Sequence, residues 1–361
     1  MGDGSTEYNR MTVGLDLGDK YSHICALDTD SGELVEESRL RTTPEAFGRR
    51  FGYEGGLRVA VEVGTHSPWV SRLLEDCGHE VLVANPRRTR LIYGEGRKTD
   101  KLDAQKLARL ARADPELLYP IGHRGEDSQA NLSLIHSREA LVRSRSQLIS
   151  HTRGTVKSFG SRLPGCSAPS FHKKVREHLP PELAEGLAPI VDTIASLTEK
   201  IGDYDRRIER LATERYPGTE LLRQVQGIGT LTALTFVLTL EDPKRFAKSR
   251  DVGAYLGLVP GRDQSGDKDV QRGITCAGDK MLRAMLVSST HYILGPFSQD
   301  SDLKRHGQKI AERGGKNAKK RAVVAVARKL SVVLHHLWVS GEVYEPLHNA
   351  RRTEAIGEEI A

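Results

Sequence analysis

The first 120 residues alternate short strand-like segments with helix-like segments, and this alternation restricts that part of the chain to a layered α/β fold. The first three strands are joined by short turns, and the other two each follow a helix. Such a meander followed by β-α-β-α elements predicts one mixed sheet, ordered third, second, first, fourth, fifth, with helices packed against it. Strands are predicted at residues 12–18, 22–28, 34–41, 57–63 and 79–84, and helices at residues 44–52, 67–77, 86–93 and 101–113.

The pattern becomes helical from about residue 125. Apolar residues from Ile190 to Leu211 recur at alternating spacings of four and three, which is typical of a coiled-coil seam. With Pro189 in its first turn, this helix is expected to pair with a helix at about 128–159 as an antiparallel hairpin. The predicted divisions are an α/β domain at 11–120, a helical coiled-coil segment at 125–215, a helical carboxy-terminal domain at 216–345 and a disordered tail at 346–361.

Composition excludes several classes of protein. Hydrophobic residues make up 38% of the chain, enough for a buried core, and no run of 18 apolar residues is present, so no membrane span is expected. The first ten residues lack the basic start and apolar stretch of a signal peptide. The four cysteines are far apart and form no C-x-x-C pair, which argues against a disulfide framework and a zinc ribbon. A cytoplasmic protein is therefore expected.

Positive charge is concentrated in two stretches. Residues 304–329 hold ten Lys/Arg and one acid, and residues 134–162 hold six Lys/Arg and one acid, whereas the whole chain has a net charge of +6. Such patches suit a polyanion such as nucleic acid, although a solvated helix face is the alternative. A helix running to about Trp338 has its apolar stripe on the opposite side from four basic residues, which we therefore predict to bind nucleic acid. These four are Lys316, Lys319, Lys320 and Arg321.

Four carboxylates are candidates for a metal site. Asp16 ends the first strand and Glu62 ends the fourth, and in the predicted order these strands are neighbours with their carboxyl ends at one crevice. Asp100 and Asp103 lie three residues apart at a helix start, so they share a face. Four converging carboxylates suit two Mg²⁺ or Mn²⁺ ions, as used in phosphoryl transfer. Alternatively, Asp100 only caps the helix and Asp103 is a solvated acid.

The carboxy-terminal part adds two polar features. Gly227 and Gly229 lie between two predicted helices, as in a helix-hairpin-helix whose backbone N–H groups approach a phosphate; a tight turn between helices is the alternative. Residues 260–273 are polar and glycine-rich and are predicted to form an exposed loop, with Ser265 at its centre. Arg283 follows this loop and is a candidate to neutralise phosphate charge.

A resemblance to a known family is carried by three segments, GLDLGDKYSH, VAVEVGTHSPW and RKTDKLDAQKLARL. They resemble the amino-terminal domain of the DEDD transposases of the insertion sequence one-ten family, which relate to Piv-type invertases and RuvC-like nucleases. The resemblance implies an RNase H-like (RuvC-like) domain whose catalytic and metal-binding tetrad is Asp16, Glu62, Asp100 and Asp103. Downstream, Gly-Ile-Gly and G-L-x-P-x4-S-G are similar to the family's carboxy-terminal transposase domain, and this implies that Ser265 is the nucleophile that links covalently to DNA.

The resemblance implies a transposase or recombinase that cleaves and rejoins DNA strands. It also implies a donor and a target DNA, a structured guide RNA, a homo-oligomer (dimer or tetramer), and a prokaryotic cytoplasmic protein associated with the nucleoid. Three other functions stay open. They are a RuvC-like junction-resolving endonuclease that uses water as the nucleophile, an actin-like sugar kinase or ATPase, and a non-catalytic nucleic-acid-binding protein.

Overall fold

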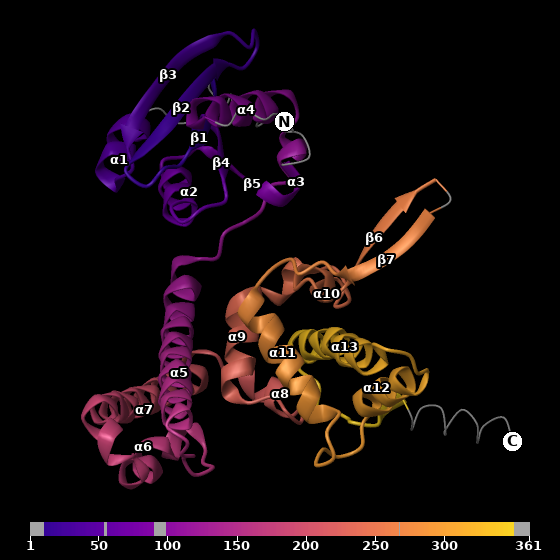
Figure 1. Cartoon of the computed structure of the whole chain (residues 1–361). Coiled ribbons are helices and arrows are strands. Elements are labelled where there is room, and N and C mark those ends of the chain that lie inside the picture. The colour runs from indigo at the N-terminus through magenta and orange to yellow at the C-terminus, as the bar shows by residue number, and fades with distance from the viewer. Residues whose placement is uncertain (1–10, 54–55, 90–98, 267, 350–361) are drawn as a thin grey trace, which may run out of the picture. The chain divides into compact units, whose positions relative to one another are not determined.

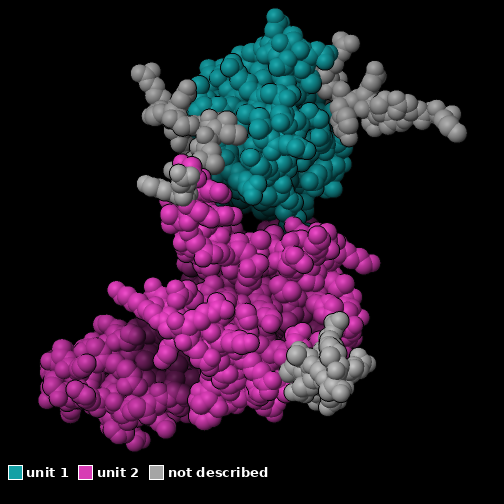
Figure 2. Space-filling model, turned by 90° about the vertical axis from the view of Figure 1, so that its right-hand side faces the viewer, with its two compact units in different colours: residues 1–125 teal, residues 126–361 magenta. Residues whose placement is uncertain are grey.

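The computed structural model describes residues 11–53, 56–89, 99–266 and 268–349. It divides the chain into two compact units, residues 1–125 and residues 126–361, which are coloured separately in Figure 2. Each unit has its own hydrophobic clusters. Part of the helix predicted at 86–93 and most of the tail predicted to be disordered lie outside the described residues.

Unit 1 contains a five-stranded sheet in the order β3-β2-β1-β4-β5 (Figure 1), which confirms the predicted order. Strand β1 pairs antiparallel with β2 and parallel with β4, so the sheet is mixed as expected. The strands are β1 (Met11–Asp16), β2 (Tyr21–Asp28), β3 (Leu34–Arg41), β4 (Arg58–Glu62) and β5 (Glu80–Ala84). The helices are α1 (Pro44–Phe51), α2 (Ser67–Asp76), α3 (Pro86–Thr89), α4 (Asp100–Ala113) and the 3-10 helix η1 (Pro115–Leu118).

The two faces of the sheet are covered by different helices. Alternate strand residues such as Val13 and Leu15 form one cluster with Phe47 of α1 and Val70 of α2. The opposite face packs against α4, because α4 contacts β1, β2 and β4. This division follows from the period of two in a strand, which sends successive side chains to opposite faces.

The helical hairpin predicted for the middle of the chain is present in unit 2. Helix α5 (Glu126–Ser158) packs against α7 (Pro181–Arg215). Three seam residues, Ile194, Ile201 and Ile208, are buried. The predicted start of the second helix is wrong: α7 begins at Pro181, and Pro189 lies inside it on an exposed position. A proline inside a helix lacks the N–H that would donate to the carbonyl four residues before it, so α7 continues through Pro189 without that hydrogen bond.

The helices that follow α7 in the chain surround one core. It contains Leu222, Phe236, Leu256, Leu286 and Leu334. Helix α9 also shares a cluster with α5 and α7, so the hairpin and the carboxy-terminal helices form one unit. The further helices are α6 (Phe171–Val175), α8 (Thr219–Arg223), α9 (Thr230–Leu240), α10 (Asp251–Tyr255), α11 (Lys280–Ile293), α12 (Asp302–Glu312) and α13 (Ala318–Ser340). Short 3-10 helices lie at η2 (Ala168–Ser170), η3 (Arg176–His178) and η4 (Pro243–Arg245).

Two further expectations need correction. The loop predicted at 260–273 is a two-stranded hairpin, β6 (Pro260–Ser265) and β7 (Lys268–Ile274). The predicted tail is ordered over its first residues, because the N–H of Asp302 donates to the carbonyl of Pro346 at 2.7 Å. Helix α13 is long and apolar enough to cross a membrane by length and composition alone, although it contains no unbroken run of 18 apolar residues. Its apolar residues, among them Leu330, lie in the core of unit 2.

Candidate active site

The ends of β1 and β4 bring two carboxylates side by side. These strands are parallel, and Leu15 is the register partner of Val61. The next residue on each strand, Asp16 and Glu62, therefore occupies the same level of the sheet, and both side chains project from the same face. Both residues are partly buried. The convergence expected from strand order thus follows directly from the register.

Helix α4 begins above this edge of the sheet and carries the other two acids. The hydroxyl of Thr99 accepts a hydrogen bond from the N–H of Leu102 at 3.3 Å, which caps the helix so that Asp100 is its first residue. At β3, Glu37 accepts hydrogen bonds from Lys101 (2.5 Å) and Gln105 (2.7 Å), which fastens the first turns of α4 to the sheet. The first turn, with both acids, is therefore held in place.

Gly14 determines how closely α4 approaches β1. A Cβ atom at this position would lie 2.1 Å from the carbonyl oxygen of Ala104 and 2.5 Å from the backbone nitrogen of Ala108. Only a residue without a side chain allows two backbones to come this close. Gly14 lies two residues before Asp16 and therefore on the same face. Sequence analysis missed this role, although a glycine two positions before a strand-end acid was visible.

The carboxylates act on one another electrostatically. Burial first, and then the negative charges of Asp100, Asp103 and Glu62, raise the pKa of Asp16 from its usual 3.8 to about 6. His23, the register partner of Asp16 on β2, opposes this rise, and its Nε2 lies 3.9 Å from Oδ2 of Asp100. Sequence analysis did not single out His23, although the β1–β2 turn places it opposite Asp16.

The four carboxylates supply the donor chemistry of a hard cation, since all their ligand atoms are oxygens. Mutual repulsion at one sheet edge is what a bound divalent ion would relieve. Within the described ranges, however, no three Asp, Glu, His or Cys side chains lie close enough together to hold an ion as they stand. The residues therefore fit Mg²⁺ or Mn²⁺ in kind, and their side chains have to draw together to bind one.

Ser265 lies in unit 2, at the tip of the β6–β7 hairpin. It is exposed, its register partner is Lys268, and Gly266 follows it in a left-handed turn (φ 54°). The hairpin extends away from the helices of its unit (Figure 1). Two cross-strand ion pairs join β6 to β7: Arg262 binds Asp269 through two hydrogen bonds (2.7 and 2.6 Å), and Arg272 binds Asp263.

Arg283 lies at the base of this hairpin and contacts both of its legs. Its Nη1 donates to the carbonyl of Leu256, before β6 (2.9 Å), and to the carbonyl of Ala277, after β7 (2.6 Å). Glycines permit the close approach of the two legs, because a Cβ on Gly257 would lie 2.2 Å from the nitrogen of Ala277. The guanidinium is thus engaged with backbone carbonyls, and contact with a phosphate stays a prediction.

The other predicted nucleic-acid contacts lie apart from one another. Gly227 is packed against α11, where a Cβ would meet Tyr292 at 3.1 Å, whereas Gly229 precedes α9 with open space around it. Lys316, Lys319, Lys320 and Arg321 are all exposed at the start of α13. The four basic residues are therefore more accessible to a phosphate than Gly227 is.

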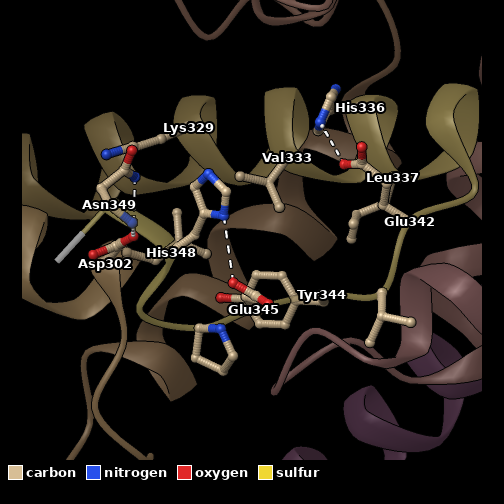
Figure 3. A pocket seen from close by; sticks show the side chains of 13 residues that line it. Asp302, Lys329, Val333, His336, Leu337, Glu342, Tyr344, Glu345, His348 and Asn349 are labelled. Carbon is tan, nitrogen blue, oxygen red and sulfur yellow. Dashed lines mark hydrogen bonds and ion pairs between the residues drawn. The ribbon is translucent and has the colours of Figure 1, made fainter. Parts of the chain in front are cut away.

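A cavity of about 500 Å³ lies between α12, α13 and residues 342–349 (Figure 3). Two histidines of this cavity pair with glutamates: His336 with Glu342 at 3.2 Å, and His348 with Glu345 at 3.4 Å. Asn349 donates to Asp302, as the dashed lines show. These contacts are typical of a chain segment packed against helices, and they give no reason to place chemistry there.

Comparison with known proteins matches both units. The family model for DEDD transposases of IS110 elements, described as Transposase, matches residues 13–160, and the model described as Transposase IS116/IS110/IS902 family matches residues 219–299. The chain is 28% identical over 345 residues to the transposase for insertion sequence element IS1111A of Coxiella burnetii, covering 92% of this chain and 90% of that protein.

Two further relatives are similar over most of their length. The transposase for insertion sequence element IS1328 of Yersinia enterocolitica is 29% identical over 289 residues, which is 77% of this chain and 82% of that protein. The Sinorhizobium fredii protein y4pF/y4sB, provisionally named a transposase, is 30% identical over 305 residues, or 82% of this chain and 76% of that protein.

Proposed function

The chain belongs to the IS110 family of DEDD transposases, and we propose that it cleaves and rejoins DNA strands with a divalent-metal site and a serine nucleophile. The proposed metal ligands are Asp16, Glu62, Asp100 and Asp103, and the proposed nucleophile is Ser265. The observation that carries the proposal is the gathering of carboxylates at the carboxyl ends of β1 and β4, where burial and then their mutual repulsion raise the pKa of Asp16. An exposed serine at the tip of a hairpin supports the second part.

The proposed reaction is a transesterification at phosphorus. Ser265 Oγ loses its proton and forms a bond to the phosphorus of a DNA phosphodiester, and the bond to the leaving sugar oxygen breaks. That oxygen takes up a proton and becomes a free hydroxyl. When a hydroxyl of another strand attacks the phosphoserine, a new phosphodiester forms and the serine is released, so strands rejoin without an outside energy source.

The carboxylates serve this reaction by neutralising charge. A bound Mg²⁺ or Mn²⁺ would supply stabilisation of the phosphodiester charge and of the leaving oxygen. Gly14 lets α4 carry its two acids down to the strand ends, and the cap at Thr99 fixes where the helix starts. The exposed position of Ser265 leaves room for a bulky phosphodiester.

Several finer features of the proposal rest on family membership. We infer an RNase H-like (RuvC-like) arrangement for unit 1, a helix-hairpin-helix at Gly227 and Gly229, and a carboxy-terminal transposase domain at 216–345. A guide RNA, a dimer or tetramer, and a place in the prokaryotic cytoplasm at the nucleoid belong to the same inference. The basic residues at the start of α13 support a nucleic-acid partner.

The experiment that tests the nucleophile is a denaturing gel of the protein with end-labelled DNA and Mg²⁺. The wild type is expected to carry labelled DNA covalently, and Ser265→Ala is expected to lose both this adduct and strand joining. Gln264→Ala changes the neighbouring exposed residue of β6 and serves as the matched control. Ser265→Cys is expected to keep weak activity, because a thiolate attacks phosphorus poorly.

The second candidate is a RuvC-like endonuclease in which the carboxylates act with water. It is favoured by one observation, that all four acids lie in unit 1, which holds no part of the hairpin. In that case Ser265→Ala nicks DNA at the wild-type rate and no adduct forms. Asp16→Asn, Glu62→Gln and Asp103→Asn are expected to abolish cleavage under either mechanism, and cleavage that persists in excess EDTA would exclude both.

A further inference from the structure

A groove of about 630 Å³ runs between helix α13 and the end of strand β7. On the helix side its wall is a stripe of residues spaced four apart, which places them on one face. Cations alternate with aliphatic side chains along this stripe: Lys320, Val324, Arg328 and Val332. The opposite wall is the strand from Gln271 to Ile274.

The groove is positively charged throughout. The ionisable side chains that line it are five Lys/Arg and one His, and none of its described lining residues is acidic. Arg272 is paired with Asp263, but Lys320, Arg328 and Lys329 form no ion pair with any residue that the structure describes. Uncompensated cations beside aliphatic walls match a polyanion that also carries apolar surface, such as a nucleic-acid strand with its sugars.

The dimensions of the groove fit a short stretch of one strand. Lys320 and Arg328 are eight residues apart on α13, which corresponds to about 12 Å at the rise of an α-helix. A DNA strand carries one charge per about 3.4 Å of axis, so this span covers roughly three to four phosphates. The stripe is therefore long enough for two separate phosphate contacts on the same strand.

The groove also leads toward the proposed nucleophile. Strand β7 runs from Lys268, the register partner of Ser265, to the groove wall that begins at Gln271. Three residues of extended strand span about 10 Å. A nucleic-acid strand that leaves the groove and follows the hairpin therefore lies level with Ser265 after a few nucleotides.

We propose that this groove holds the sugar–phosphate backbone of the DNA strand whose phosphodiester Ser265 attacks. Lys320, Arg328 and Lys329 contact phosphates, and Val324 and Val332 pack against sugars. The assignment of the strand rests on the proposed function. The groove itself is an additional binding site, distinct from the carboxylates and from the serine.

The experiment measures the binding of a short fluorescent single-stranded DNA to the Ser265→Ala protein, without divalent metal, over a range of salt concentrations. Lys320→Gln combined with Arg328→Gln removes two groove charges and is expected to flatten the salt slope by about 1.4, at about 0.7 for each phosphate contact on a single strand. The comparator is Lys309→Gln with Arg313→Gln, which removes two exposed charges from the same basic stretch outside the groove lining.

Each outcome decides the assignment. The assignment is supported if the salt slope of DNA binding becomes flatter only when Lys320 and Arg328 are changed. It is overturned if changing Lys309 and Arg313 flattens the salt slope equally, because the DNA is then attracted by a diffuse positive patch. The same double variant is also measured with a single-stranded RNA and with acidic peptides. If it weakens the binding of RNA but not of DNA, the assignment to DNA is overturned; if it weakens only the binding of acidic peptides, the groove belongs to a protein partner. Ala325→Glu, which adds a negative charge to the lining without removing a packed side chain, is the second variant and is expected to weaken binding more than tenfold at low salt.

Failure of the groove and failure of the proposed function remain distinguishable. If wild-type protein forms the serine adduct but the groove pair binds DNA normally, the groove assignment is wrong and the serine mechanism stands. If the groove pair binds weakly but wild-type protein forms no adduct, the groove binds DNA and the proposed nucleophile is wrong. Melting curves of each variant check that the loss is not one of folding.

Discussion

Asp16→Asn is expected to stabilise unit 1 when no metal is present, although it removes a proposed metal ligand. The shift in the pKa of Asp16 from 3.8 to about 6 is about two units, which corresponds to at most about 3 kcal/mol of unfavourable interaction for the ionised form. Asparagine carries no charge that burial would desolvate or that the neighbouring carboxylates would repel, so the variant should regain on the order of 1–3 kcal/mol in free energy of unfolding at pH 8.

The gain should depend on pH in a defined direction. Because the pKa of Asp16 is higher in the folded than in the unfolded chain, the folded state binds the proton more tightly, and the stability this provides is lost as pH rises from about 4 to about 6. The gain in free energy of unfolding of Asp16→Asn over the wild type is therefore absent below pH 3.8, grows between pH 3.8 and about pH 6, and is constant at higher pH. Mg²⁺ should reverse the order at pH 8, since it binds the folded wild type more tightly than the variant.

The assay is urea unfolding followed by tryptophan fluorescence. The chain has two tryptophans, and Trp338→Phe leaves Trp69, which packs edge-on against Phe47 in unit 1, as the reporter. Asp19→Asn removes the same charge from an exposed position three residues away and is the control. If Asp16→Asn lowers the stability of unit 1 at pH 8 without metal, or if its effect is the same at pH 4, burial and the neighbouring carboxylates do not raise the pKa of Asp16, and the electrostatic basis for the metal site is lost.

Three further predictions concern other parts of the chain. Gly14→Ala places a Cβ 2.1 Å from a backbone oxygen of α4, so it should lower the free energy of unfolding by about 1–3 kcal/mol and remove most of the cleavage activity. The control is Gly48→Ala in α1, where a Cβ would have nothing within 4 Å; thermal melting should show no loss of stability for this variant. Arg283→Lys should loosen the base of the hairpin and lower the yield of serine adduct without changing the salt slope of DNA binding; a slope reduced by about one would assign Arg283 to a phosphate instead. Changing Lys316, Lys319, Lys320 and Arg321 together to Ala should flatten the salt slope on duplex DNA by roughly three to four, and an unchanged slope would make them a solvated helix face.

The sheet and its acids could be predicted because local patterns and strand order determine them together. Short strand-like segments bounded by turns and helices located the strands, and once β1 and β4 are neighbours, Asp16 and Glu62 must meet. The contribution of Gly14 could not be predicted in the same way. It depends on how close α4 comes to β1, and no local pattern in the sequence specifies that distance.

The hairpin that carries Ser265 could not be predicted because it lacks the usual signal of a strand. Its residues are mostly exposed, so they show no apolar alternation. Cross-strand pairs such as Arg262 with Asp269 join the strands instead, and they can be recognised only once the register is known. The groove beside α13 was missed for a related reason: its two walls lie about fifty residues apart in the sequence.

The contact between Gly14 and α4 fixes the spacing between the two elements that carry the carboxylates. Because backbone meets backbone there, no side-chain rotamer stands between the strand that ends in Asp16 and the helix that begins at Asp100. Substitutions in the apolar cluster on the other face of the sheet can then shift α1 and α2 without altering that spacing. Copies of a mobile element accumulate such substitutions as they diverge. This arrangement allows the apolar core to change in sequence while the spacing of the acids stays the same.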